Sequence, residues 1–164
     1  MIMKRKLLTL LIGLNSLYVI SQTFPIDPSF ESYLIAEGID SNVMPDNAIS
    51  YTDASKVTNT VFVLNGLDIQ TLSGIENFTY LEEIHINGGS LNLLQLDFSQ
   101  NKLLKVIDTN IPNLSTLVVN GADALERIRV GPTQLTSLDV SQNMELSTLS
   151  IYGSILTSID VSAN

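Results

Sequence analysis

The C-terminal part of the chain repeats one pattern of apolar and polar positions at a constant step. The sequence LTSLDVSQN at 135–143 returns as LTSIDVSAN at 156–164, and the phrase at 125–130 returns at 146–151. Within each phrase apolar and polar residues alternate, as in a β-strand with one buried face. A unit this thin cannot bury its apolar side alone, so the pattern predicts stacked units in a solenoid.

Two strand-like phrases recur in each unit. The first phrases begin at Leu81, Leu104, Leu125 and Leu146, and the second at Leu93, Leu114, Leu135 and Leu156. The step from Leu81 to Leu104 is two residues longer than the other steps between first phrases. The two extra residues fall within 87–90, where glycines can form a loop. With a longer unit at 62–81, the spacing predicts about five repeats of about 21–23 residues over 57–164.

Residues 24–38 carry the start and stop signals of a short helix. Asp27 can cap it, Pro28 suits its first position, and Gly38 can take the left-handed exit conformation. One face of this helix is apolar, with Phe30, Tyr33 and Leu34. Residues 39–56 are rich in Asp, Asn, Ser and Thr and predict turns and loop. We therefore expect 22–56 to form a helical cap and linker that covers the open end of the first repeat.

The segment 1–21 is typical of a signal peptide. A basic start at 4–6 is followed by an apolar stretch at 7–20, which is too short for a confident membrane span of roughly 20 residues. We place the cleavage between Ser21 and Gln22. The expected mature chain is secreted or at the cell surface, with no stable membrane insertion.

Composition narrows the classes of function. The chain is 45% apolar and 15% charged, which predicts a folded core. Removing three basic residues with the leader changes the formal net charge from −9 to −12, which disfavours nucleic-acid partners. The absence of cysteine excludes disulfides, thiol catalysis and cysteine-ligated zinc, and no other cofactor motif is present. We expect no cofactor.

Three segments together resemble a known family. The spacing Leu72-x-Gly74-Ile75-x-x-Phe78-x-x-Leu81 is similar to the first repeat of bacterial internalin-like leucine-rich repeat proteins. The repeated phrase at 135–143 resembles repeats of secreted Bacteroidetes leucine-rich repeat proteins, and the predicted helix resembles their cap. The resemblance implies an α/β, mostly β, leucine-rich repeat solenoid with an N-terminal helical cap, and a non-catalytic recognition function.

The chain also departs from that family pattern. The usual asparagine after the first strand is replaced in the four rows by Gly89, Pro112, Thr133 and Ser154. Asparagines recur instead after the second phrase, at Asn101, Asn143 and Asn164, interrupted by Ala122. We predict that these amides are buried and bind backbone groups of the turns.

Outward positions of the first phrases form columns once the repeats stack. One column is Glu82, Lys105, Glu126 and Ser147, and another is His85, Asp108, Arg129 and Ser150. Their alternating charges could simply fix the register of neighbouring strands. Alternatively, the concave strand face binds a protein or glycan, with Tyr152 as an aromatic anchor. The candidate partner-binding residues are Glu83, His85, Asn87, Asp108, Asn110, Arg127, Arg129 and Tyr152.

Neither catalysis nor a metal site follows from these columns. His85 and Ser150 would lie about 14 Å apart, three strand spacings, whereas a serine nucleophile needs its base within roughly 3 Å. A further column of Asp97, Asp139 and Asp160 is better explained as a solvated acidic face than as converging calcium ligands, and calcium dependence stays open.

The array stops at Asn164 without a closing cap. One alternative is therefore that these residues are the N-terminal part of a larger secreted protein, in which the repeats target an enzyme or adhesin domain. Another is end-to-end self-association through the uncapped C-terminal repeat, because its apolar residues would otherwise line an open end. A purely structural role, such as an adhesin spacer, is a third.

Overall fold

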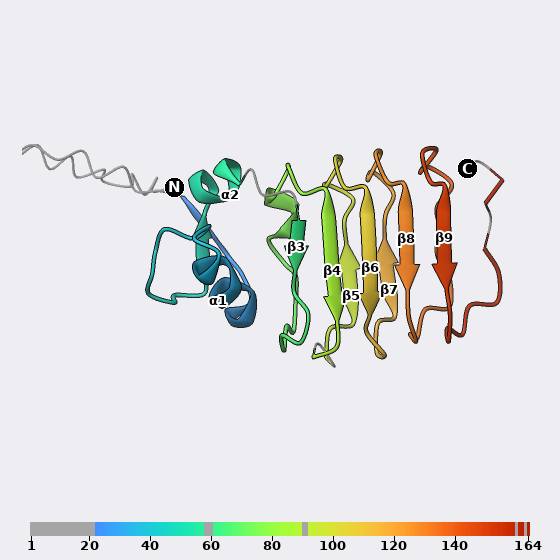
Figure 1. Ribbon diagram of the computed structural model, residues 1–164, viewed down its shortest axis with the longest axis horizontal. Coiled ribbons are helices and arrows are strands. Elements are labelled where there is room, and N and C mark those ends of the chain that lie inside the picture. The colour runs from blue at the N-terminus through green and yellow to red at the C-terminus, as the bar shows by residue number, and fades with distance from the viewer. Residues whose placement is uncertain (1–21, 58–60, 90–91, 160, 163) are drawn as a thin grey trace, which may run out of the picture.

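Five short parallel strands lie side by side and form the main sheet of the chain. The computed structural model describes residues 22–57, 61–89, 92–159, 161–162 and 164. The sheet order follows the sequence, as Figure 1 shows. Its strands are β3 (Val61–Val63), β4 (Glu83–Asn87), β6 (Val106–Asn110), β8 (Arg127–Val130) and β9 (Thr148–Ile151).

The strand register confirms the predicted phase of the repeats. Ile84 pairs with Ile107, Ile107 with Ile128, and Ile128 with Leu149, so each row stacks on the next by the step read from the sequence. The three isoleucines are fully buried and their neighbours along each strand are not. At the longer first step, Gly88 takes the left-handed conformation that a loop there requires, with φ +72°.

A second, smaller layer lies behind the main sheet. It contains the parallel pair β5 (Gln95–Asp97) and β7 (Thr116–Val118). The second phrases at 135–140 and 156–161 were also predicted to be extended segments, but their described residues form no regular strand. Leu138 and Val140 are nevertheless buried, like their counterparts in β5 and β7 and just after these strands. Apolar burial therefore continues along this side after the strand ladder ends, because burial needs only the side chains to point inward.

The recurring asparagines bind the turns as the sequence predicts. The Asn143 amide donates to the carbonyl oxygens of Val119 and Ala122 at 3.0 and 2.9 Å. Asn101 and Asn164 each donate to two carbonyls of a preceding turn in the same way. Asn101 and Asn143 are fully buried. One amide per turn thus holds neighbouring turns together, except at Ala122.

The predicted N-terminal helix is present as α1 (Pro28–Ala36). Asp27 accepts hydrogen bonds from the first-turn N–H groups of Ser29 and Phe30. Phe30 is fully buried and its ring packs at 5.9 Å, centroid to centroid, from that of Phe62 on β3. The second oxygen of Asp27 accepts from Gln70 N, so one carboxylate both caps α1 and ties it to the first turn of the solenoid.

Residues 39–56 contain regular elements that the sequence did not predict. β2 (Ala48–Ser50) pairs antiparallel with β1 (Thr23–Pro25) and leads directly into α2 (Tyr51–Lys56). The buried Glu31 carboxylate fixes the approach to β2, because it accepts from the backbone N–H groups of residues 46–48. The boundary of a separate cap at residue 56 stays a prediction. In the described part of the chain, the helices are too short to cross a membrane.

Candidate binding face

The outward side of the main sheet, called here the strand face, carries a continuous set of polar side chains. Alternation along each strand puts one residue in two on this side, while the residues between them are buried or half-buried. The strand face consists of Val61, Val63, Glu83, His85, Asn87, Val106, Asp108, Asn110, Arg127, Arg129, Thr148, Ser150 and, just after β9, Tyr152. All eight candidate partner-binding residues therefore lie together.

A line of acidic, imidazole and guanidinium side chains crosses the strand face from β4 to β8. His85 Nε2 lies 3.4 Å from Glu83 Oε2, and its Nδ1 lies 3.7 Å from Asp108 Oδ2. The same Asp108 oxygen is 3.9 Å from the Arg129 guanidinium, whose side chain is 59% exposed. Pairs this long and only partly buried each contribute little to folding stability, from about 0 to 1 kcal/mol.

The neighbouring charged column behaves as a structural ladder at its first step. Lys105 pairs with Glu82, and this hydrogen bond raises the pKa of the Lys105 ammonium. Further along, the Ser147 hydroxyl donates to the Glu126 carbonyl oxygen. A structural role in fixing the strand register therefore suits this column, whose residues lie just before the strands begin.

Asparagines and a glycine shape the edge of the strand face where the strands end. Asn87 N donates to the Asn65 side-chain oxygen at 2.7 Å, and Asn87 lies beside Asn110 in the register. The next position in this row is Gly131, where an added Cβ would lie 2.9 Å from the Asn110 amide. Tyr152 follows in the same row and is 49% exposed. A position without a side chain therefore separates Asn110 from the tyrosine ring.

His85 and Ser150, the possible base and nucleophile, are placed as the sequence analysis expects. His85 lies on β4 and Ser150 on β9, with β6 and β8 between them. The register places Asp108 and then Arg129 in the intervening positions of this column. The strand arrangement therefore gives Ser150 no contact with His85 that could activate it.

The aspartates of the second phrase hold turns. Asp97 Oδ1 accepts from Ser99 N at 2.9 Å, and Asp139 makes the equivalent bond to Ser141 N at 3.0 Å. Hydrogen bonds from Ser141, with one from Asn120, lower the pKa of Asp139. Asp160 lies outside the described residues. Within the described ranges, no three His, Cys, Asp or Glu residues are placed to hold a metal ion.

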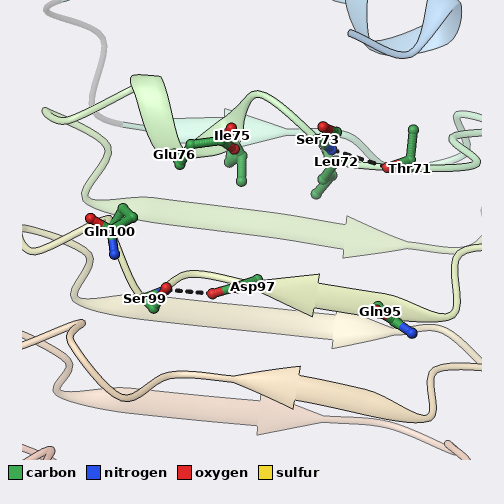
Figure 2. A pocket seen from close by; sticks show the side chains of 9 residues that line it. All are labelled: Thr71, Leu72, Ser73, Ile75, Glu76, Gln95, Asp97, Ser99 and Gln100. Carbon is green, nitrogen blue, oxygen red and sulfur yellow. Dashed lines mark hydrogen bonds between the residues drawn. The ribbon is translucent and has the colours of Figure 1, made fainter. Parts of the chain in front are cut away.

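A groove of about 480 Å³ lies on the other side of the molecule, between the first turn and β5. Figure 2 shows its walls, one made by 71–76 and the other by β5 with the turn after it. The lining residues are Thr71, Leu72, Ser73, Ile75, Glu76, Gln95, Asp97, Ser99 and Gln100. Sequence reasoning missed this groove because its shape depends on how residues 71–76 approach the next turn, which the repeat spacing does not specify.

Comparisons with known proteins return matches among solved structures. No protein-family model matches the chain, and no curated protein matches it. Twenty chains of solved structures do match. One is the functional domain of InlJ from Listeria monocytogenes, which includes a cysteine ladder, at 20% sequence identity and a TM-score of 0.36. The alignment covers 88% of this chain and 41% of that one, so the chain spans less than half the length of that domain.

Proposed function

We propose that this chain is a non-catalytic recognition module that binds a protein or a glycan through the strand face. The observation that carries the proposal is the exposure of in-register polar and aromatic side chains on one side of the main sheet. Arg129 is 59% exposed at its side chain, and Tyr152 and Val63 are 49% and 48% exposed. Arginine and tyrosine are enriched at protein interfaces, above all at the positions that dominate affinity.

The charges of the strand face are divided in a way that suits a partner. Glu83 and Asp108 lie on β4 and β6, whereas Arg127 and Arg129 lie on β8 next to Tyr152. The contacts between the two halves are long, so they leave the arginines able to bind groups outside the chain. A partner with an acidic group over β8 and a basic group over β4 would match this pattern, which favours one orientation of binding.

A purely structural interpretation of the same residues explains less. Partly exposed polar contacts of 3.4–3.9 Å add little stability, and register is already set by the buried rows of isoleucine and leucine. Arg127 lies opposite Val106 and Thr148, so the ladder interpretation gives it no charged cross-strand partner. Recognition accounts for both arginines.

A paired substitution tests the proposal. Partners found on a glycan array or by pull-down with the purified chain are measured again with Arg129→Ala/Tyr152→Ala. We expect affinity to fall at least about tenfold, since central interface residues cost about 1–2 kcal/mol or more when truncated. The matched control is Lys102→Ala/Tyr80→Ala, which removes an exposed cation and a tyrosine that is 53% exposed outside the strand face. Equal affinities for both variants would overturn the proposal.

We further propose that the module acts outside the cell or on its surface. The support is the basic start and apolar stretch of residues 1–21, which lie outside the described residues. Expression of the full sequence in a bacterial host should yield exported protein whose first residue is Gln22. Retention of residues 1–21 on a cytoplasmic product would contradict export.

A further inference from the structure

One edge of β5 has unpaired backbone groups. In a parallel pair, successive residues direct their N–H and C=O groups to opposite sides of the strand. Leu94 O accepts from Thr116 N, and Phe98 N donates to Val118 O, so the even-numbered residues of this segment face β7. The backbone groups of Gln95 and Asp97 therefore point the other way. Among the described residues no strand pairs with β5 on that side.

The first turn explains why this edge stays open. At the positions equivalent to β5, residues 72–74 of the first turn form no strand, and the short 3₁₀ helix η1 (Ile75–Asn77) follows them. Its neighbouring backbone bonds are local, from Ile75 N to Leu72 O and from Asn77 N to Gly74 O. Gly74 allows this conformation, because its φ is +97° and an added Cβ would lie 2.8 Å from side chains of the N-terminal segment. The backbone of the first turn is thus bonded to itself and offers β5 no partner.

The groove described above lies along this open edge. Gln95 and Asp97 line one wall, and Thr71 to Glu76 line the other (Figure 2). The lining contains two carboxylates, Glu76 and Asp97, and no lysine, arginine or histidine. Each carboxylate already accepts one backbone N–H through one oxygen, from Gly74 and Ser99 respectively. Those bonds orient the side chains without neutralising their charge.

We propose that this groove binds an extended basic peptide segment by strand addition to β5. The N–H and C=O groups of Gln95 and Asp97 pair with the backbone of the peptide, as in other complexes where an extended segment joins a sheet edge. Lysine or arginine side chains of the peptide lie against Glu76 and Asp97. The three-residue length of β5 limits the contact to a short segment and a modest affinity. The site is on the opposite side from the strand face and does not depend on the function proposed for that face.

The first test is an NMR titration of the ¹⁵N-labelled chain with a hexapeptide of alternating lysine and valine. The expected result is a saturable downfield shift of the Gln95 and Asp97 amide protons, because hydrogen bonding deshields them. The same peptide with every backbone nitrogen methylated should leave these amides unchanged, and an alternating glutamate and valine peptide should not bind. Absence of the shifts at millimolar peptide, or equal shifts with the methylated peptide, would overturn strand addition.

Matched variants separate the groove from general attraction of a basic peptide to an acidic chain. Glu76→Gln/Asp97→Asn removes both charges but keeps oxygens that can accept from Gly74 N and Ser99 N. Loss of two exposed ion pairs should weaken binding roughly 2- to 30-fold. The control variant is Asp139→Asn/Glu145→Gln, in which Asp139 is the equivalent of Asp97 in another repeat and Glu145 is a further exposed carboxylate. This control also removes two negative charges, and it should leave the affinity for the peptide unchanged. Equal weakening by both pairs would show unspecific attraction and overturn the proposal.

A backbone variant tests the edge itself. Gln95→Pro removes an N–H group that faces the groove and leaves the hydrogen bonds between β5 and β7 intact. Edge strands tolerate proline at such a position, where the lost N–H is not part of the ladder. It should abolish the shift at Asp97 while circular dichroism and urea unfolding stay close to those of the unmodified chain. Undiminished peptide binding by this folded variant would contradict the proposal. The proposal would also be contradicted if a neutral oligosaccharide shifted the same amides and the basic peptide did not, since that result would assign the groove to glycans.

Discussion

Replacing Asn143 by aspartate tests whether one buried amide per turn holds the solenoid together. The change exchanges an NH₂ group for an oxygen of similar size, so packing is preserved and only the donor is lost. In the native chain this NH₂ group donates to the carbonyl oxygens of Val119 and Ala122 at 3.0 and 2.9 Å, in a fully buried site. The variant would direct a carboxyl oxygen at two carbonyl oxygens.

The structure indicates the size of the effect. Two hydrogen bonds of about 0.5–1.5 kcal/mol each account for about 1–3 kcal/mol. A buried carboxylate without a partner raises the total to about 3–5 kcal/mol at neutral pH. The preceding turn has Ala122 at the equivalent position, which indicates that the chain can fold with one amide of this row missing. Asn143→Ala should therefore cost less than Asn143→Asp, about 1–2 kcal/mol.

Urea unfolding followed by circular dichroism measures these losses. Burial will raise the folded-state pKa of the new carboxyl above its unfolded value near 4, so the variant loses stability as pH rises through that range. Near pH 3 its deficit should shrink to about that of one lost hydrogen bond, because the protonated carboxyl can donate its O–H to one of the two carbonyl oxygens. Asn101→Asp should lose a similar amount of stability. Asn164→Asp should lose much less, because Asn164 makes the two equivalent bonds with an exposed side chain. Equal losses at buried and exposed positions, or a pH-independent deficit, would refute this reasoning.

Three further substitutions test the N-terminal part of the fold, each by urea unfolding. Gly74→Ala should destabilise by about 2–5 kcal/mol, because φ is +97° and the new Cβ would meet two buried side chains at 2.8 Å; a loss below about 1 kcal/mol would contradict this. Asp40→Asn should stabilise the chain at pH 7, since Asp40 Oδ2 is buried without a partner among the described residues and burial raises the pKa of Asp40. The free energy of unfolding of the native chain therefore falls as pH rises from about 3.8 through the raised pKa of Asp40. The variant has no carboxyl group at this position, so its free energy of unfolding should not fall in this way. Glu31→Gln should cost on the order of 2 kcal/mol and speed hydrogen exchange at 46–48, because the new NH₂ group faces N–H donors; unchanged exchange would count against it.

The repeat pattern was sufficient to predict the strand face. A strand directs alternate side chains to opposite sides, and a nearly constant step along the sequence brings equivalent positions of successive strands together. His85, Asp108 and Arg129 could therefore be assigned to one row before any coordinates were known, and the register confirms this. The buried role of Asn143 followed from the same periodicity, since a polar residue that recurs among apolar rows needs a backbone partner.

Other features of the surface could not be read from the pattern. Glu83 was assigned to the strand face, but its approach to His85 depends on rotamers that a repeat does not specify. Val63 on the same face belongs to a first unit too diverged to align by its step. Both residues contribute to the surface a partner would meet, which shows that periodicity identifies positions better than contacts.

Local, periodic information in the sequence by itself determined the helix at its start, the rows of the main sheet and the amide ladder. Contacts between segments far apart in the chain decided the rest. β1 and β2 form because residues 23–25 and 48–50 meet, and neither of these short segments has a pattern of its own. The open edge of β5 exists because the first turn bonds to itself beside it. Such pairing depends on distance in space, which no repeat along the chain encodes.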